Sequence, residues 1–152
     1  MIAACKKLQL RWQSQDDVVR PSGTHSGQIA AIEERYSLEL PRQFRNYLET
    51  TVPQADYCGM DDEYFEWWPT ERVKNIPDEY PHPLSNGIIA GQSERYLFFA
   101  DYMIWCWAWA ISCTQDENRG KVVLINGLTD QFVADSFDDF VNKYMHNPEE
   151  LG

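Results

Sequence analysis

The chain has 152 residues, enough to fold as one domain around its own hydrophobic core without a disulfide or a structural metal. Its formal net charge of −11 repels nucleic-acid phosphates and anionic membrane surfaces, so direct binding to either is not expected. The same charge attracts a basic partner, although solubility alone also accounts for an acidic composition. The N-terminal residues resemble no signal peptide, and no apolar run approaches the ~20 residues of a membrane span, which favours a cytoplasmic protein.

Two short helices are predicted in the first third of the chain, after an N-terminal lead-in over residues 1–27 whose second half, 13–27, is polar. Apolar residues recur at helical spacing over 28–36, where Ser26 is a plausible cap. The same spacing recurs between Pro41 and Pro53. Pro41 suits the first turn of this second helix, and Pro53 ends it.

The rest of the chain is predicted to be an irregular segment, a run of strands and a last helix. The segment 54–91 is rich in proline and holds one short strand at 63–68. Aromatic and β-branched runs separated by turn sequences then predict four more strands, at 95–101, 103–112, 120–125 and 130–135. A C-terminal helix follows, capped by Ser136.

This order of elements predicts an α+β fold. We expect a single domain with a mainly antiparallel sheet of about five strands, packed with two N-terminal helices and one C-terminal helix. The domain is expected over residues 28–147, with a short tail at 148–152.

One predicted strand carries three of the six tryptophans at alternate positions. Side chains alternate between the faces of a strand, so Trp105, Trp107 and Trp109 are expected to share one face. That face is either a second buried layer or a partly open platform for a partner. Burial is the stronger expectation, because a bare patch of three tryptophans would promote aggregation.

Motifs for catalysis or metal binding are lacking in the sequence. The three histidines have no partner at metal-ligand spacing, and no two of the four cysteines form a C-x-x-C pair. Adjacent carboxylates in a polar run are more typical of a solvated face than of a catalytic pair, although a metal-dependent hydrolase is a rival hypothesis. We therefore expect a protein that is not an enzyme and that needs no metal or cofactor.

Acidic and aromatic residues gather in the middle of the chain. Residues 56–79 hold eight acidic and two basic side chains. Acidic groups steer a basic protein into contact, and aromatic rings anchor it once bound. The candidate partner-binding residues are Asp56, Tyr57, Asp61, Asp62, Glu63, Tyr64, Glu66, Trp67 and Trp68, joined by Trp107. The alternative is that the rings belong to the core and the acids only confer solubility.

Two stretches together resemble the SUKH superfamily, the Smi-and-Knr-like domain. "IAAIEERYSLELPRQFRNYLETT" is similar to the helix, hydrophobic-Leu-Pro step and aromatic helix with which that family opens, and "LFFADY" and "VADSFDDFVNKYM" to its later motifs. The loop after the second helix departs from the family's Asn-Gly-Gly. The residues that carry the match are Leu40, Pro41, Phe44, Phe99, Ala100, Asp101, Ala134, Ser136, Phe137 and Phe140.

The resemblance implies a non-enzymatic binding domain in which the matching residues are structural. Bacterial members are mostly immunity proteins that neutralise toxins, commonly nucleases, of polymorphic or contact-dependent toxin systems. The resemblance therefore implies a bacterial protein whose partner is a cognate toxin. The acidic charge of the chain indicates that this toxin is basic. We expect the protein to be cytoplasmic and a monomer. Fungal members imply the alternative of a regulatory scaffold.

Overall fold

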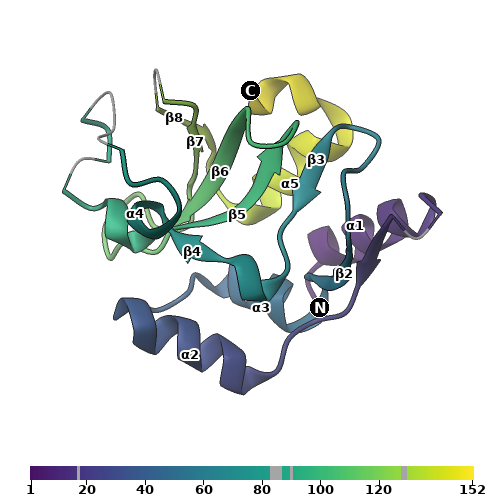
Figure 1. Ribbon diagram of the computed structural model, residues 1–152, viewed down its shortest axis with the longest axis horizontal. Coiled ribbons are helices and arrows are strands. Elements are labelled where there is room, and N and C mark those ends of the chain that lie inside the picture. The colour runs from purple at the N-terminus through teal and green to yellow at the C-terminus, as the bar shows by residue number, and fades with distance from the viewer. Residues whose placement is uncertain (17, 83–86, 90, 128–129) are drawn as a thin grey trace.

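The computed structural model describes the chain except for residues 17, 83–86, 90, 128 and 129 (Figure 1). Its helices are α1 (Ala3–Gln13), α2 (Ser26–Tyr36), α3 (Arg42–Thr50), the short α4 (Ile76–Glu79) and α5 (Phe137–His146), with 3-10 turns η1 (Thr70–Arg72), η2 (Ser93–Arg95) and η3 (Pro148–Leu151). Its strands are β1 (Val19–Pro21), β2 (Pro53–Cys58), β3 (Phe65–Trp67), β4 (Lys74–Asn75), β5 (Tyr96–Tyr102), β6 (Trp107–Ser112), β7 (Val122–Ile125) and β8 (Gln131–Ala134).

An antiparallel sheet forms the centre of the molecule and confirms the predicted α+β class. Its strands are hydrogen-bonded in the order β3-β5-β6-β7-β8, and β4 joins the same edge of β5 as β3. β1 and β2 form a separate two-stranded sheet. The sequence predicted neither of these two strands, because β1 lies in the polar lead-in and β2 in the segment expected to be irregular.

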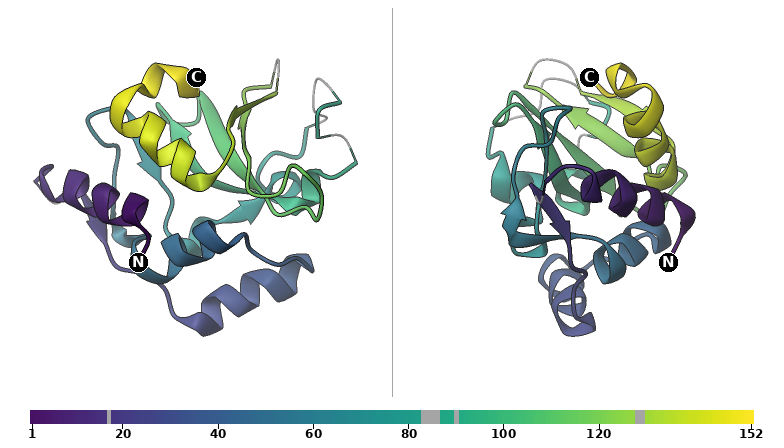
Figure 2. Two further views of the ribbon diagram at one scale, coloured as in Figure 1. Left: turned by 180° about the vertical axis from the view of Figure 1, so that it is seen from behind. Right: turned by 90° about the vertical axis from the view of Figure 1, so that its right-hand side faces the viewer.

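Both faces of the central sheet are buried. α1, α3 and α5 cover one face, and α5 lies across the strands (Figure 2). The segment around α4 covers the other face, where Ile76 and Ile89 join a cluster with Phe98 and Ala110. A strand buried on both sides needs no polar face, which explains why β5 is an almost continuous apolar run.

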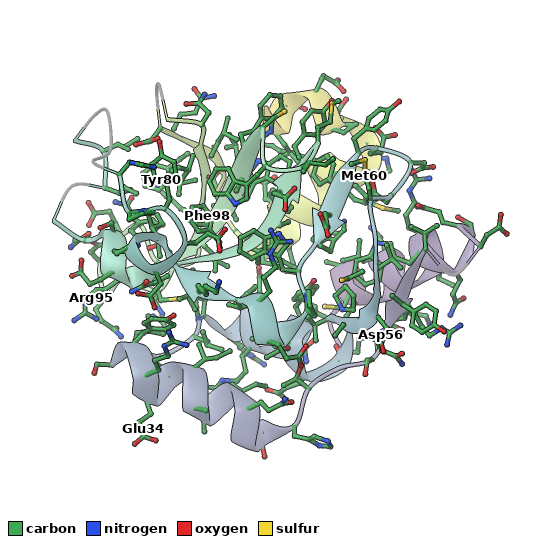
Figure 3. The ribbon with its side chains drawn as sticks, in the orientation of Figure 1. Glu34, Asp56, Met60, Tyr80, Arg95 and Phe98 are labelled. Carbon is green, nitrogen blue, oxygen red and sulfur yellow. The ribbon has the colours of Figure 1, made fainter. Side chains whose placement is uncertain are left out.

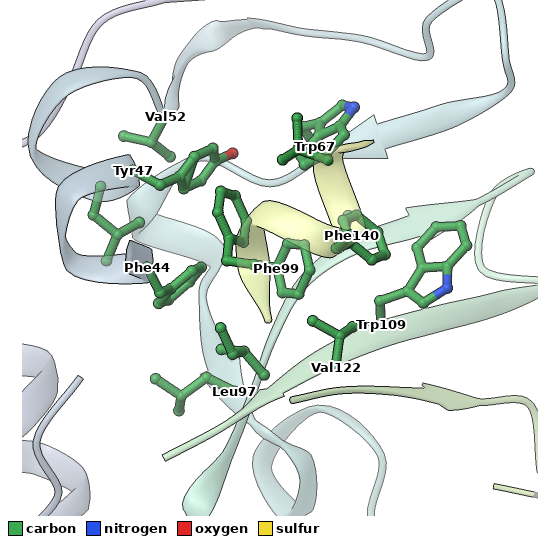
Figure 4. Close-up of a cluster of buried hydrophobic side chains, with 14 of the residues drawn as sticks. Phe44, Tyr47, Val52, Trp67, Leu97, Phe99, Trp109, Val122 and Phe140 are labelled. Carbon is green, nitrogen blue, oxygen red and sulfur yellow. The ribbon is translucent and has the colours of Figure 1, made fainter. Parts of the chain in front are cut away.

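Aromatic rings make up much of the core between the sheet and the helices. Phe140 of α5 contacts Phe99, Trp67 and Trp109, with ring centroids 5.1, 5.8 and 5.6 Å away (Figure 4). Phe44 of α3 contacts Phe99 at 5.6 Å. The high aromatic content is therefore used mainly inside the protein.

The three predicted helices are confirmed as α2, α3 and α5. Pro41 lies at the N-cap of α3. The Ser136 hydroxyl caps α5 by accepting a hydrogen bond from the Asp139 backbone N–H at 3.0 Å. Ser26 is the first residue of α2 and makes no side-chain capping bond, so its expected role as a cap is wrong.

One helix, α1, was not predicted from the sequence. Cys5, Leu8 and Trp12 lie on its buried face, and the Trp12 ring meets Trp67 edge-on at 5.6 Å. The expected tail is also packed, because Leu151 is buried and its carbonyl accepts a 2.8 Å hydrogen bond from the Trp109 indole. Both ends of the chain thus contribute to the core.

The tryptophans expected on one strand face divide between the two sides of the sheet. β6 begins only at Trp107, because Met103, Ile104 and Trp105 form a turn with positive φ angles. Trp109 is buried in the larger core with Trp107 partly buried beside it. Trp105 packs from the turn against the opposite cluster. The expected three-tryptophan face is therefore wrong, and burial is right for Trp109.

The cysteines provide a test of the packing of α1. Cys5 and Cys113 are buried, whereas Cys106 is exposed, and burial raises the pKa of the Cys113 thiol to about 12. In the native protein we expect a thiol reagent to modify Cys106 rapidly and to leave Cys5 and Cys113 unmodified until the chain unfolds. Mass spectrometry of the labelled peptides reports each site. Labelling of Cys5 as fast as Cys106 would show that α1 is not docked.

Candidate partner-binding surface

Three segments far apart in the sequence meet at one end of the central sheet. They are the loop between β2 and β3, the turn between β5 and β6, and the C-terminal η3, which lies beside β6 in Figure 1. Between them is a cavity of about 360 Å³, named the aromatic cleft here. It is lined by Glu63, Tyr64, Phe65, Tyr102, Trp107, Trp109, Pro148, Glu149 and Gly152.

Stacked rings form the wall of the aromatic cleft. Tyr102 and Trp107 face each other across the β5–β6 pair, with centroids 4.4 Å apart and planes within 5° of parallel. Tyr64 meets Tyr102 edge-on at 6.3 Å. Behind them Phe65 stacks on the buried Trp109 at 4.4 Å. The cleft is thus a continuation of the core that opens at the surface.

A bulge in β5 directs Tyr102 toward the cleft. Phe98 pairs with Ala110 and Ala100 with Trp109, so Phe99 is an extra residue in β5. Phe99 and Ala100 consequently both belong to the larger core, and the alternation resumes one step later. Without the extra residue Tyr102 would lie on the opposite face.

A buried carboxylate holds the loop that carries Glu63 and Tyr64. Asp61 accepts hydrogen bonds from the backbone N–H groups of Glu63 and Phe65, at 2.9 and 3.0 Å. It also accepts from the Trp67 indole at 3.3 Å and from the Tyr144 hydroxyl of α5. Burial raises the pKa of Asp61, and these four donors compensate its lost hydration. Asp61 positions the loop and does not face a partner.

The two loops beside the cleft are joined by their backbones. Tyr64, at φ 65°, accepts a 3.0 Å hydrogen bond at its carbonyl from the Met103 N–H. Arg11 of α1 supports the same loop through a 2.7 Å ion pair with Asp62. Tyr64, Met103 and Ile104 are 53%, 45% and 81% exposed, so the joined loops present apolar groups to solvent.

A second buried carboxylate holds the β5–β6 turn from the other side. Asp101 accepts from the Trp68 indole at 2.7 Å and from the Trp105 N–H at 3.1 Å. Arg72 lies 3.4 Å from its carboxylate and stacks over Trp68 at 3.9 Å. Glu66 is 3.7 Å from Arg72, and burial raises the pKa of the Glu66 carboxyl. Glu66 and Asp101 therefore share Arg72 in a structural network.

The structure brings together some of the predicted partner-binding residues and separates others. Glu63, Tyr64 and Trp107 line the cleft, and Asp62 is exposed next to them. Asp56 and Tyr57 lie on β2, away from the cleft (Asp56 is labelled in Figure 3). The Arg20 guanidinium carbon lies 3.9 Å from the centroid of the Tyr57 ring.

Three predicted contacts are corrected by burial. Trp67 and Trp68 have no exposed surface, and Asp61 is 5% exposed, so none of them is available to a partner. Trp67 belongs to the larger core, Trp68 to the smaller one, and Asp61 to the loop network. A short aromatic strand with acidic neighbours does not indicate which of its rings face outward.

Several residues of this surface were not predicted from the sequence. In the sequence-based prediction Tyr102 falls between two strands, Glu149 in the tail, and Met103 and Ile104 inside a strand. These residues meet at the surface because of the bulge in β5 and the docking of η3. Neither feature produces a pattern that can be recognised in a single sequence.

The residues that carried the family resemblance are mostly structural, as expected. Ala134 is buried, Ser136 caps α5, and Asp101 forms the network described above. Glu33 links α2 to α3 by accepting from the Leu40 N–H at 2.9 Å and by pairing with Arg45. The buried core members of the motif are Leu40, Phe44, Phe99, Ala100, Phe137 and Phe140.

The fold and this surface define a compact α+β domain whose loops present acidic and apolar groups. A sequence model of the SMI1 / KNR4 family (SUKH-1) matches residues 23–143. Because the match spans most of the chain, this protein belongs to that family, which confirms the resemblance. No curated protein matches the chain.

The described residues contain neither a candidate membrane span nor a candidate metal cluster. None of the helices found there is long and apolar enough to pass through a lipid bilayer. Among the same residues, no group of three or more His, Cys, Asp or Glu side chains could hold a metal ion.

Replacing Asp101 tests the network that holds the β5–β6 turn. Asp101→Asn removes the charge opposite Arg72 and one of the acceptors for Trp68 and Trp105, so we expect a loss of about 1–3 kcal/mol in the free energy of unfolding. Urea titration followed by tryptophan fluorescence measures it. Glu66→Gln is the control, with a smaller loss because Glu66 is partly exposed. Equal stability of Asp101→Asn and the parent protein would contradict the structural role.

Proposed function

We propose that this protein is a non-enzymatic immunity protein that binds a cognate toxin with a basic surface and blocks it. Family membership supports a binding domain of this kind. The observation that carries the proposal is the surface at the cleft. The joined loops expose Tyr64, Met103 and Ile104, Asp62 is exposed beside Tyr64 in the chain, and Glu149 lines the cleft together with Tyr64.

The chemistry of this surface suits a cationic protein. A toxin that cleaves nucleic acid must present positive groups to phosphates, and an acidic inhibitor complements them. Long-range attraction accelerates the encounter, whereas desolvated apolar contacts slow dissociation. The surface combines both kinds of group within the joined loops.

The buried carboxylates also favour binding over catalysis. Asp61 and Asp101 are the carboxylates near the cleft that are removed from solvent, as a catalytic acid or base commonly is. Both are saturated by donors from the protein, four for Asp61, and hold loops in place. Their environment is accounted for by structure alone.

On this proposal the protein acts in the bacterial cytoplasm as a monomer beside its toxin, and binds neither nucleic acid nor membrane. A regulatory scaffold of the Smi-and-Knr-like type is the alternative. It predicts several weaker partners and no protection from a toxin.

The test partner is the toxin that a gene neighbouring this one is expected to encode. Co-expression of the two chains is expected to restore growth, and purified proteins are expected to associate faster at low salt. In a triple variant, Asp62→Asn, Glu63→Gln and Glu149→Gln, we expect association to slow about tenfold and to depend less on salt. Stopped-flow fluorescence measures both effects.

A matched control separates this surface from net charge. Glu34→Gln, Glu39→Gln and Glu117→Gln remove three exposed charges elsewhere and are expected to change the association rate little. Equal slowing by both triple variants would show that net charge, not this surface, steers the partner. Turnover of a substrate by the pure protein, or absence of protection, would refute the immunity function.

A further inference from the structure

We propose that the aromatic cleft receives one arginine side chain of the protein partner. The proposal deepens the immunity function, and it rests on that function for the identity of the partner. It concerns the cavity of about 360 Å³ between the β2–β3 loop, the β5–β6 turn and η3.

Charge complementarity identifies the occupant as a cation. The charged side chains that line the cleft are Glu63 and Glu149, and both are acidic. Within the described part of the chain, Glu149 has no ion pair, and Glu63 lies 3.7 Å from Arg11 in its closest one. A cation that enters would be shared by two carboxylates whose charge the protein leaves largely uncompensated.

The rings of the cleft favour a cation as well. The face of an aromatic ring carries negative electrostatic potential, and tryptophan attracts cations most strongly. Trp107 and Tyr102 form the stacked wall, and Tyr64 closes it from the β2–β3 loop. A cavity of this size is at the lower end of those that bind small ligands, which suits a single long side chain.

The shape of the wall selects arginine over lysine. A planar guanidinium stacks on an aromatic plane and uses its fork of N–H groups toward carboxylates, whereas an ammonium group is a compact point charge. The cleft offers both a flat stacked pair and carboxylates on two different segments, Glu63 and Glu149. Arginine is also the basic residue most often found at binding hot spots.

The cleft is already organised in the unbound protein. Asp61 fixes the loop of Glu63, and the Tyr64 carbonyl accepts from the Met103 N–H at 3.0 Å. On the other side, the Leu151 carbonyl accepts from the Trp109 indole at 2.8 Å and holds η3. Little side-chain or loop freedom is then lost when the cleft is occupied, which favours binding.

The Trp107 indole N–H is a natural reporter of occupancy. Its nitrogen is buried without a hydrogen-bond partner, and Gly152 packs so closely against it that an added Cβ would lie 2.7 Å away. The chain has six tryptophans, so a nitrogen–proton correlation spectrum of the indole groups contains few signals. Trp107→Phe assigns the relevant one by its disappearance.

The experiment titrates the full protein with a capped Gly-Arg-Gly peptide to millimolar concentration, a range that suits one side chain binding alone. We expect a saturable shift of the Trp107 indole signal. The citrulline peptide, which keeps the shape of arginine without its charge, is expected to leave the signal unchanged. The lysine peptide is expected to bind more weakly than the arginine peptide.

Two variants of equal charge change locate the effect. Glu149→Gln is expected to raise the dissociation constant of the arginine peptide about two- to fivefold, the scale of one exposed ion pair. Glu34→Gln on α2, at the far end of the molecule in Figure 3, is expected to leave it unchanged. Both residues are exposed, so neither substitution threatens folding. An unshifted Trp107 signal, equal shifts with citrulline, or equal weakening by both variants overturns the proposal.

The outcome is separable from that of the immunity function. If the protein neutralises a toxin while the arginine peptide fails to shift Trp107, the cleft proposal is wrong and the function stands. If the peptide binds in the cleft while no toxin is neutralised, the arginine site stands and the immunity function is wrong.

Discussion

An extra residue at Phe99 determines which side of the sheet each later side chain of β5 faces. Before it, Phe98 faces the smaller core; after it, Tyr102 faces the larger one and reaches the aromatic cleft. Asp101, one step earlier, turns to the opposite side and meets Trp68 and Arg72. The short run Phe-Ala-Asp-Tyr, residues 99–102, therefore places one ring in the core, one ring at the cleft and a carboxylate under the turn, and the candidate surface depends on all three.

Two buried carboxylates hold the loops next to this strand in fixed positions. Asp61 gathers four donors around the β2–β3 loop, and Asp101 binds the turn in which Met103, Ile104 and Trp105 have positive φ. Residues with a Cβ rarely adopt that conformation, so surrounding contacts must stabilise it. The cost of burying charge is met here by hydrogen bonds that rigidify loops, and rigid loops lose less entropy when they bind.

Periodicity in the sequence identified α2, α3, α5 and every strand of the central sheet except the two-residue β4, because helices and strands with strong apolar patterns are determined by local sequence. It failed where distant contacts decide the structure. α1 is held by Trp12 against Trp67, and β6 starts late because Asp101 holds the turn, so neither was visible in the sequence. Of the candidate site, the acidic and aromatic composition was predictable. The inward direction of Trp67 and Trp68, and the arrival of Tyr102 and Glu149, were not.

The docking of η3 has a consequence for how such a surface diversifies. The groups that shape the cleft from within, such as Phe65 and Trp109, are part of the interior, whereas Glu149 and Tyr64 stand on segments anchored elsewhere by the backbone. Exchanging the side chains of Tyr64 and Glu149 leaves the hydrogen bonds accepted by Asp61 and by the Leu151 carbonyl intact. One scaffold can in this way support a repertoire of recognition surfaces, and retargeting it calls for changes at a handful of outward positions without redesign of the interior.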